Sequence, residues 1–258
     1  MDRESRRLTA SFIGIDLAWA PRNSSGLAAL EPRGPRLHVQ ALETRLGDDE
    51  IVGFVQDHLR PLTVVLVDAP LVIPNLTGMR ACDRETHRRF GRRQAGAYPA
   101  NRENMGRYNG GTPRGAALLA RLIACGFQAG PLPVPPVRRG LYLFECYPHP
   151  AQVVLFGLPV TLKYKLKRQG YEVARSEFRR YLGLVRGLRT PELALGQELL
   201  QSLDVGGAVG RAYKDCEDRL DALFCAYLAA LVPEGRFDML GTPEEGSIVV
   251  PRELDLFS

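Results

Sequence analysis

The sequence predicts an α/β protein with a mixed sheet flanked by helices. Nearly unbroken apolar segments at 12–18, 64–68 and 141–145 are typical of strands buried on both faces. Segments 48–59 and 215–231 instead repeat apolar residues at helical spacing. Because a helix stands between the first and second buried strands, a right-handed crossover is expected to place them parallel in one sheet.

Composition narrows the class of protein. The 258 residues are 45% hydrophobic and 24% charged, which suits one globular domain over 1–258 and excludes disorder, collagen and coiled coils. The 34 Lys and Arg exceed the 29 Asp and Glu, giving a net charge of +5. No apolar run is long enough to span a membrane, and the first residues lack the apolar core of a signal peptide. The five cysteines have no close CxxC spacing. We therefore expect a cytoplasmic protein with reduced thiols.

The N-terminal half is expected to build most of the sheet. After strand 12–18, segments 26–30 and 36–42 are separated by a turn-forming stretch and complete an antiparallel meander. Three acidic residues at 48–50 are typical of a helix N-terminus, and the helix extends to about residue 59. Strand 64–68 follows and ends before Pro70.

The second half contains an insertion and the most informative helix. Residues 71–139 are rich in Arg, Gly and Pro and are interpreted as a basic segment inserted after the fourth strand. Strand 141–145 resumes the sheet, and a helix is expected at 177–188. In helix 215–231 one stripe is large and apolar, while the other combines small residues with two acids. Small residues let a helix lie close to a sheet, so both acids are expected to project past the sheet end.

Five acids stand where apolar residues are expected: Asp16, Asp68, Glu145, Asp218 and Asp221. The carboxyl ends of parallel strands meet at one sheet edge, so these acids are expected to converge there. Crowded carboxylates require a cation, and oxygen ligands select Mg²⁺ or Mn²⁺ over zinc. Alternatives are a backbone cap or Arg pair for Asp16 and a helix-dipole contact for Asp218. Glu145 is a ligand, a proton shuttle or a substrate-orienting group.

Four motifs carry a family resemblance: GIDLAW at 14–19, VDAP at 67–70, ECYP at 145–148 and DRLDAL at 218–223. In this order they resemble the RNase H-like superfamily and, within it, the predicted nucleases grouped as domain of unknown function 429. The last motif is also similar to the C-terminal helix of RuvC-type Holliday-junction resolvases. The resemblance implies an RNase H-like fold with a five-stranded sheet of order 3-2-1-4-5. Asp16 is then on the central strand and Asp68 on the fourth.

The same resemblance implies a function. In that superfamily, acids bind two Mg²⁺ ions that activate a water and stabilise the leaving oxygen in phosphodiester hydrolysis. Asp16, Asp68 and Asp221 are expected to hold two Mg²⁺ or Mn²⁺ ions, with Asp218 and Glu145 completing the shell. Glu145 departs from the RuvC acid set. We therefore expect a divalent-metal-dependent nuclease whose partner is nucleic acid.

Two other functions stay open. One is a non-catalytic nucleic-acid-binding protein of the same fold. The other is an actin-like or sugar-kinase phosphotransferase, which is disfavoured because residues 17–21 lack a glycine-rich phosphate loop.

Basic residues in the insertion suggest how nucleic acid is held. Arginines interleaved with aromatic residues are expected to track phosphates beside the acids; the alternative is a solvated helix. The nucleic-acid-binding candidates are Arg80, Arg84, Arg88, Arg89, Arg92 and Arg93. A second basic stretch either extends this surface or is a plain exposed loop: Lys163, Lys165, Lys167 and Arg168. Trp19 either stacks on a base or packs at the sheet end. On the last helix, Asp215 and Glu217 are expected to face solvent.

Overall fold

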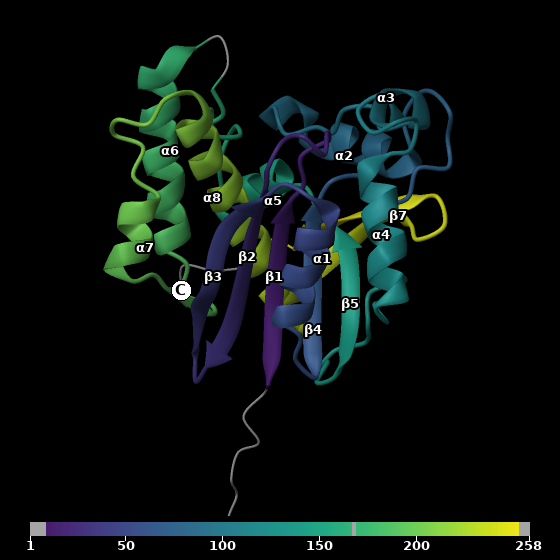
Figure 1. The fold of residues 1–258 in the computed structure, drawn as a ribbon, viewed down its shortest axis with the longest axis horizontal. Coiled ribbons are helices and arrows are strands. Elements are labelled where there is room, and N and C mark those ends of the chain that lie inside the picture. The colour runs from purple at the N-terminus through teal and green to yellow at the C-terminus, as the bar shows by residue number, and fades with distance from the viewer. Residues whose placement is uncertain (1–8, 167–168, 253–258) are drawn as a thin grey trace, which may run out of the picture.

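The computed structural model describes residues 9–166 and 169–252. Its centre is a six-stranded sheet of order β5-β4-β1-β2-β3-β6 (Figure 1). The strands are β1 (Ala10–Asp16), β2 (Ser25–Arg33), β3 (Arg36–Arg45), β4 (Leu62–Asp68), β5 (Gly140–Glu145) and β6 (Glu192–Ala194). The α/β class with a mixed sheet is therefore confirmed.

Strand directions follow the pattern of the sequence. β1, β2 and β3 are antiparallel neighbours, which confirms the expected meander, whereas β4 is parallel to both β1 and β5. The β2–β3 turn places Gly34 at a φ of +64°, which glycine adopts without steric cost. The expected total of five strands was wrong. β6 adds a sixth, parallel to β3, and its three residues are too few to show an alternating pattern.

Helices cover both faces of the sheet. One face packs against α1 and α4, and the other packs against α5, α6 and α8, as Figure 1 shows. The helices of eight or more residues are α1 (Asp48–Asp57), α2 (Ala81–Phe90), α4 (Arg114–Ala124), α5 (Pro148–Leu155), α6 (Gly170–Arg186) and α8 (Gly210–Leu231). The shorter ones are η1 (Gly91–Arg93), α3 (Arg102–Gly106), α7 (Gln197–Ser202) and η2 (Val232–Glu234). Among the described residues, none of these helices has the length and apolarity needed to cross a membrane.

The segment interpreted as an insertion has two structural parts. Its first part forms α2, η1 and α3. Its second part contains α4, which buries Leu118 and Leu122 in the hydrophobic core between the sheet, α1 and α4. A hairpin of β7 (Phe237–Thr242) and β8 (Gly246–Pro251) follows α8 and packs on α2 around Cys82 and Ile248. The residue pattern did not predict this hairpin. The hairpin thereby supports α2, the helix that follows the carboxyl end of β4 in the chain.

Candidate functional site

Asp16 and Asp68 lie side by side because of strand register. β1 and β4 are parallel, and Asp16 pairs with Asp68 as the last residue of each strand. Residues paired in this way point to the same face of a sheet, which here is the face covered by α8. The carboxyl ends of two central strands therefore deliver two carboxylates to one place.

Two glycines of the sheet allow α8 to lie close enough for Asp218 and Asp221 to approach Asp16 and Asp68. A Cβ at Gly14 would lie 2.0 Å from the carbonyl oxygen of Ala222, and a Cβ at Gly26 would lie 2.0 Å from that of Asp218. No other residue type fits beneath the helix at these two positions. The expected close packing of this helix is therefore correct, but the glycines of β1 and β2 make it possible as much as the small residues of α8 do.

Together these elements gather a carboxylate cluster, by which we mean Asp16, Asp68, Asp218 and Asp221. Burial raises the pKa of Asp16 well above its usual value, and the nearby charges of Asp218 and Asp221 raise it further. Burial likewise raises the pKa of Asp68, with added repulsion from Asp16 and Asp221. Asp218 and Asp221 are thus close enough to disfavour ionisation of Asp16, and Asp16 and Asp221 are close enough to disfavour that of Asp68.

Two lysines offset this negative charge. Lys165 Nζ lies 3.0 Å from Asp221 Oδ2, and Lys214 forms an ion pair with Asp218. Burial disfavours the ammonium of Lys165, but attraction to Asp221, Asp16 and Asp68 outweighs it and raises the pKa of this lysine. Lys165 is therefore part of the site and not of a plain exposed loop, while Lys167 and Arg168 lie outside the described residues.

The two acids of α8 are held differently. Asp221 is fully buried, and its Oδ1 accepts a hydrogen bond of 2.6 Å from the hydroxyl of Tyr164. Asp218 is 3% exposed and is paired with Lys214 one turn before it. Glu217 does not face solvent as expected: it is buried and accepts a hydrogen bond from the backbone N–H of Leu166. This bond fastens the segment that carries Tyr164 and Lys165 to α8.

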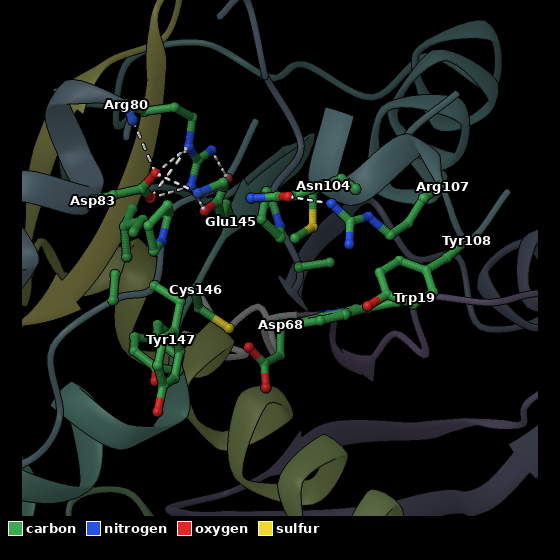
Figure 2. Close-up of a pocket in the computed structure, with 18 residues that line it drawn as sticks. Trp19, Asp68, Arg80, Asp83, Asn104, Arg107, Tyr108, Glu145, Cys146 and Tyr147 are labelled. Atoms are coloured by element: carbon green, nitrogen blue, oxygen red, sulfur yellow. Dashed lines mark hydrogen bonds and ion pairs between the residues drawn. The ribbon is translucent and has the colours of Figure 1, made fainter. Parts of the chain in front are cut away.

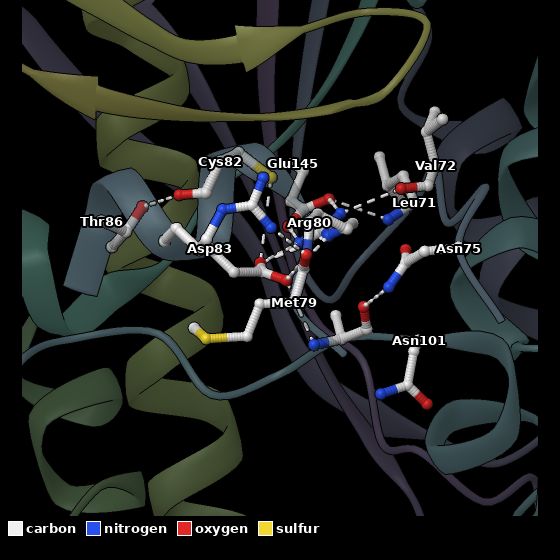
Figure 3. A network of polar contacts seen from close by, with 12 residues as sticks. Leu71, Val72, Asn75, Met79, Arg80, Cys82, Asp83, Thr86, Asn101 and Glu145 are labelled. Atoms are coloured by element: carbon white, nitrogen blue, oxygen red, sulfur yellow. Dashed lines mark hydrogen bonds and ion pairs between the residues drawn. The ribbon is translucent and has the colours of Figure 1, made fainter. Parts of the chain in front are cut away.

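Glu145 lies apart from the cluster because of the strand period. It pairs with Val67 on β4, one residue before Asp68, so its side chain starts from the opposite face of the sheet. Arg80 binds both of its oxygens, at 2.6 and 2.8 Å, and the backbone N–H of Leu71 donates to Oε2 at 2.9 Å (Figure 3). Burial raises the pKa of Glu145, and Arg80 opposes the shift. Glu145 therefore supports the chain after β4.

Arg80 differs from the other basic candidates. It is 3% exposed, and its guanidinium also binds Asp83, so it does not belong to an exposed phosphate-binding surface. The remaining candidates, Arg84, Arg88, Arg89, Arg92 and Arg93, are exposed on α2 and η1. Arg88 and Arg89 share Glu85 as a partner, and hydrogen bonds from these two arginines lower the pKa of Glu85 to about 2. The surface that these five exposed arginines form, which we call the arginine face, therefore keeps an excess of positive charge.

A pocket of about 320 Å³ opens beside the cluster, and Asp68 belongs to both. We call it the aromatic pocket because Trp19, Tyr98, Tyr108 and Tyr147 line it, together with alanine and proline side chains. In Figure 2 Asp68 lies between Tyr147 and the pair formed by Trp19 and Tyr108. A second cavity of about 600 Å³ shares these four aromatic residues and also reaches Asp16, Lys165 and Asp218. The two cavities give access from solvent to Asp16, Asp68 and Asp218.

The donor chemistry of the cluster suits a divalent cation, although its present geometry does not form a metal site. Within 9–166 and 169–252, no three His, Cys, Asp or Glu side chains are placed to hold a metal ion. Lys165 stands among the carboxylates instead. Asp16 Oδ2 is nevertheless buried with no hydrogen-bond partner in this part of the chain, which is costly for a carboxylate oxygen. Carboxylate oxygens are the donors that hard divalent cations prefer.

Comparison with known proteins identifies the family. The family model described as "Protein of unknown function (DUF429)" matches residues 14–246, a span that holds the carboxylate cluster and both lysines. The resemblance to this family is confirmed. No curated protein and no solved structure gives a significant match.

Proposed function

Because the chain belongs to this family of unknown function, DUF429, we propose from its own site that it is a divalent-metal-dependent nuclease with an RNase H-like fold. The observation that carries the proposal is the meeting of four aspartates from β1, β4 and α8 at the carboxyl ends of two parallel strands. Their desolvated charges are costly unless a cation binds them. Mg²⁺ or Mn²⁺, as two ions, is the cation we propose.

Each group of residues has a task in this proposal. Asp16, Asp68 and Asp221 hold the ions, and Asp218 completes their shell. Glu145 positions the chain after β4 by accepting a hydrogen bond from Leu71 and by pairing with Arg80, which donates to Val72. The ions supply Lewis-acid activation of water and stabilisation of the leaving oxygen. Lys165 and Lys214 balance the carboxylates when no ion is bound. The exposed arginines of α2 and η1 attract the phosphate backbone toward an otherwise acidic centre.

The proposal is tested by turnover. We expect hydrolysis of labelled DNA or RNA strands in Mg²⁺ or Mn²⁺ and none in EDTA. Asp68→Asn removes a carboxylate of the cluster and should abolish cleavage, while Asp57→Asn, an exposed acid at the far end of α1, should not change it. Circular dichroism confirms that both variants fold. Metal-independent cleavage, or full activity in Asp68→Asn, contradicts the assignment.

A metal also has a thermodynamic signature. Because the pKa values of Asp16 and Asp68 are raised, the folded protein binds more protons than the unfolded chain, so metal-free stability should fall as pH rises from about 4 through those raised values. Asp16→Asn removes one buried charge, so it should flatten this decline and raise the metal-free Tm at pH 7 by about 2–4 °C. Mg²⁺ should raise the Tm of the wild type only. Scanning calorimetry at several pH values measures all three effects, and a wild-type Tm unaffected by millimolar Mg²⁺ contradicts the metal site.

Salt dependence tests the arginine face. Neutralising Arg88, Arg89, Arg92 and Arg93 together should weaken nucleic-acid binding and reduce the slope of log affinity against log salt by about 0.7–0.9 for each phosphate that the protein no longer neutralises. Changing Arg33 and Arg36 to alanine, at the opposite end of the sheet, provides a control that removes two arginines outside this surface. Fluorescence anisotropy across a salt series gives the slopes. Equal slopes for the wild type and the four-arginine variant would assign these residues to a solvated surface.

One observation favours a second function, that of a non-catalytic nucleic-acid-binding protein. Lys165 and Lys214 already pair with Asp221 and Asp218, so two of the four carboxylates are neutralised without an ion. In that case the protein binds strands equally well in EDTA and Mg²⁺ and cleaves none.

A further inference from the structure

The exposed aromatic side chains of the protein gather at one place. Within the described residues only three Phe, Tyr or Trp side chains are exposed: Trp19 at 50%, Tyr98 at 73% and Tyr108 at 39%. All three line the aromatic pocket, although they come from separate loops. Aromatic surface left in water at one site costs hydrophobic free energy, and it marks a place where a flat apolar ligand is bound.

The part of the pocket wall around Trp19 and Tyr108 is held in position before any ligand arrives. The ring centroids of Trp19 and Tyr108 are 5.6 Å apart. Buried Arg114 donates to the carbonyl oxygen of Ala18 at 2.8 Å and so anchors the loop that carries Trp19. On the rim, Arg107 donates to Asn104 Oδ1 at 2.6 Å, as the dashed line in Figure 2 shows. Fixed walls reduce the entropy lost when a planar ligand binds.

The location of the pocket limits what that ligand is. Asp68 lines it and also pairs with Asp16 in the cluster, so an occupant lies directly beside the proposed reaction centre. Ligand pockets are about 300–1,000 Å³, and at 320 Å³ this one is at the lower end, which suits one planar ring system with part of its sugar. Amide and guanidinium groups on the rim can bond to the polar edge of such a ring.

We propose that the aromatic pocket binds one unpaired nucleobase of the substrate strand, stacked against Trp19, Tyr98 and Tyr108, so that the enzyme acts on single-stranded or locally unpaired nucleic acid. The inference rests on the proposed nuclease function and names its substrate class. Every base has a π face, so stacking binds strands of any sequence. A base paired inside a duplex cannot enter the pocket without leaving the helix, which costs the free energy of unpairing and unstacking it.

The single tryptophan of the chain provides the probe. In EDTA, which prevents cleavage, a single-stranded oligonucleotide should quench the fluorescence of Trp19. Three further ligands serve as comparisons: the duplex of the same sequence, an abasic strand of the same length and a free mononucleotide. The duplex and the abasic strand should leave the fluorescence nearly unchanged, and the mononucleotide should quench only at much higher concentration because it lacks the additional phosphate contacts.

Substitutions identify the stacking residue. Tyr98→Ala should weaken strand binding about 5- to 150-fold, the range typical of removing one stacking partner. Tyr98→Phe keeps the ring and should bind like the wild type. Ile123→Ala, an exposed apolar residue of α4 outside the pocket, controls for general loss of apolar surface.

The outcomes separate this inference from the nuclease assignment. Quenching by single strands without any metal-dependent cleavage supports the base pocket and overturns the proposed catalysis. Cleavage without quenching, or equal binding of Tyr98→Ala and the wild type, overturns the pocket and leaves catalysis standing. Equal quenching by duplex and single strand overturns the requirement for an unpaired base. Equal affinity for the mononucleotide assigns the pocket to free nucleotides and overturns the strand proposal.

Discussion

Asp221→Asn is expected to lower the rate of metal-dependent hydrolysis by more than about a hundredfold, whereas Asp218→Asn should lower it about 10- to 100-fold and recover partly in Mn²⁺. Asp221 is the deeper of the two acids, fully buried between Tyr164 and Lys165. An amide at this position offers neither the charge nor the second oxygen that a metal ligand provides. Asp218 lies nearer the N-terminal end of α8 and is paired with half-exposed Lys214, so water can replace it more readily.

Rates for both variants on one single-stranded substrate, measured in Mg²⁺ and in Mn²⁺, decide this order. Asp215→Asn is a suitable control, because Asp215 is on the same helix but is paired with exposed Arg211. Equal losses for Asp218→Asn and Asp221→Asn, with no recovery in Mn²⁺, would contradict the ordering. Full activity in Asp221→Asn would exclude α8 from catalysis.

The largest expected effect on stability is that of Arg80→Met. The side chain of Arg80 is 1% exposed, and its guanidinium binds Asp83 and Glu145, whose side chains are 1% and 5% exposed. Its removal leaves two buried carboxylates without a positive partner, which costs about 3–5 kcal/mol. Figure 3 also shows that the network reaches the segment around Leu71 and Val72. Loss of Arg80 should therefore also loosen the chain that follows Asp68.

Urea unfolding at several pH values measures this cost. Burial raises the pKa of Glu145 even beside Arg80, so its charged form should be still less favourable in the variant. The folded variant then takes up protons that the unfolded chain does not, and the loss of stability should shrink as pH falls toward 4. Arg84→Met, an exposed neighbour, should cost little, and the double change Arg80→Met with Glu145→Gln should recover part of the loss. A variant as stable as Arg84→Met would contradict the role of this network.

Several parts of the site could be predicted from residue pattern alone. A carboxylate that ends an apolar strand, as Asp16 and Asp68 do, is conspicuous in sequence because burial of an unpaired charge is costly. Small residues beside two acids likewise indicated how α8 packs. Glu145 looked equivalent to Asp68 because both end a strand, yet the register pairs it with Val67. A shift of one residue sends a side chain to the other face, and no feature of a single strand reveals that register.

The ion pairs of the site could not be predicted from the sequence either. Lys165 is separated from Asp221 by 56 positions, and Arg80 from Glu145 by 65, so only the folded chain makes them partners. In sequence Arg80 is one of six similar arginines, and burial alone distinguishes it. The β7–β8 hairpin was not predicted, although its strands are as long as β5.

The amino-acid sequence by itself determined the α/β class, the meander, the family and the acids of the cluster, because apolar periodicity and buried charge are properties of each segment alone. Tertiary structure decided which acids meet, which cations neutralise them and where the exposed aromatic residues gather. These outcomes depend on strand register and on the approach of α8 over Gly14 and Gly26, and they arise only when segments distant in sequence pack together.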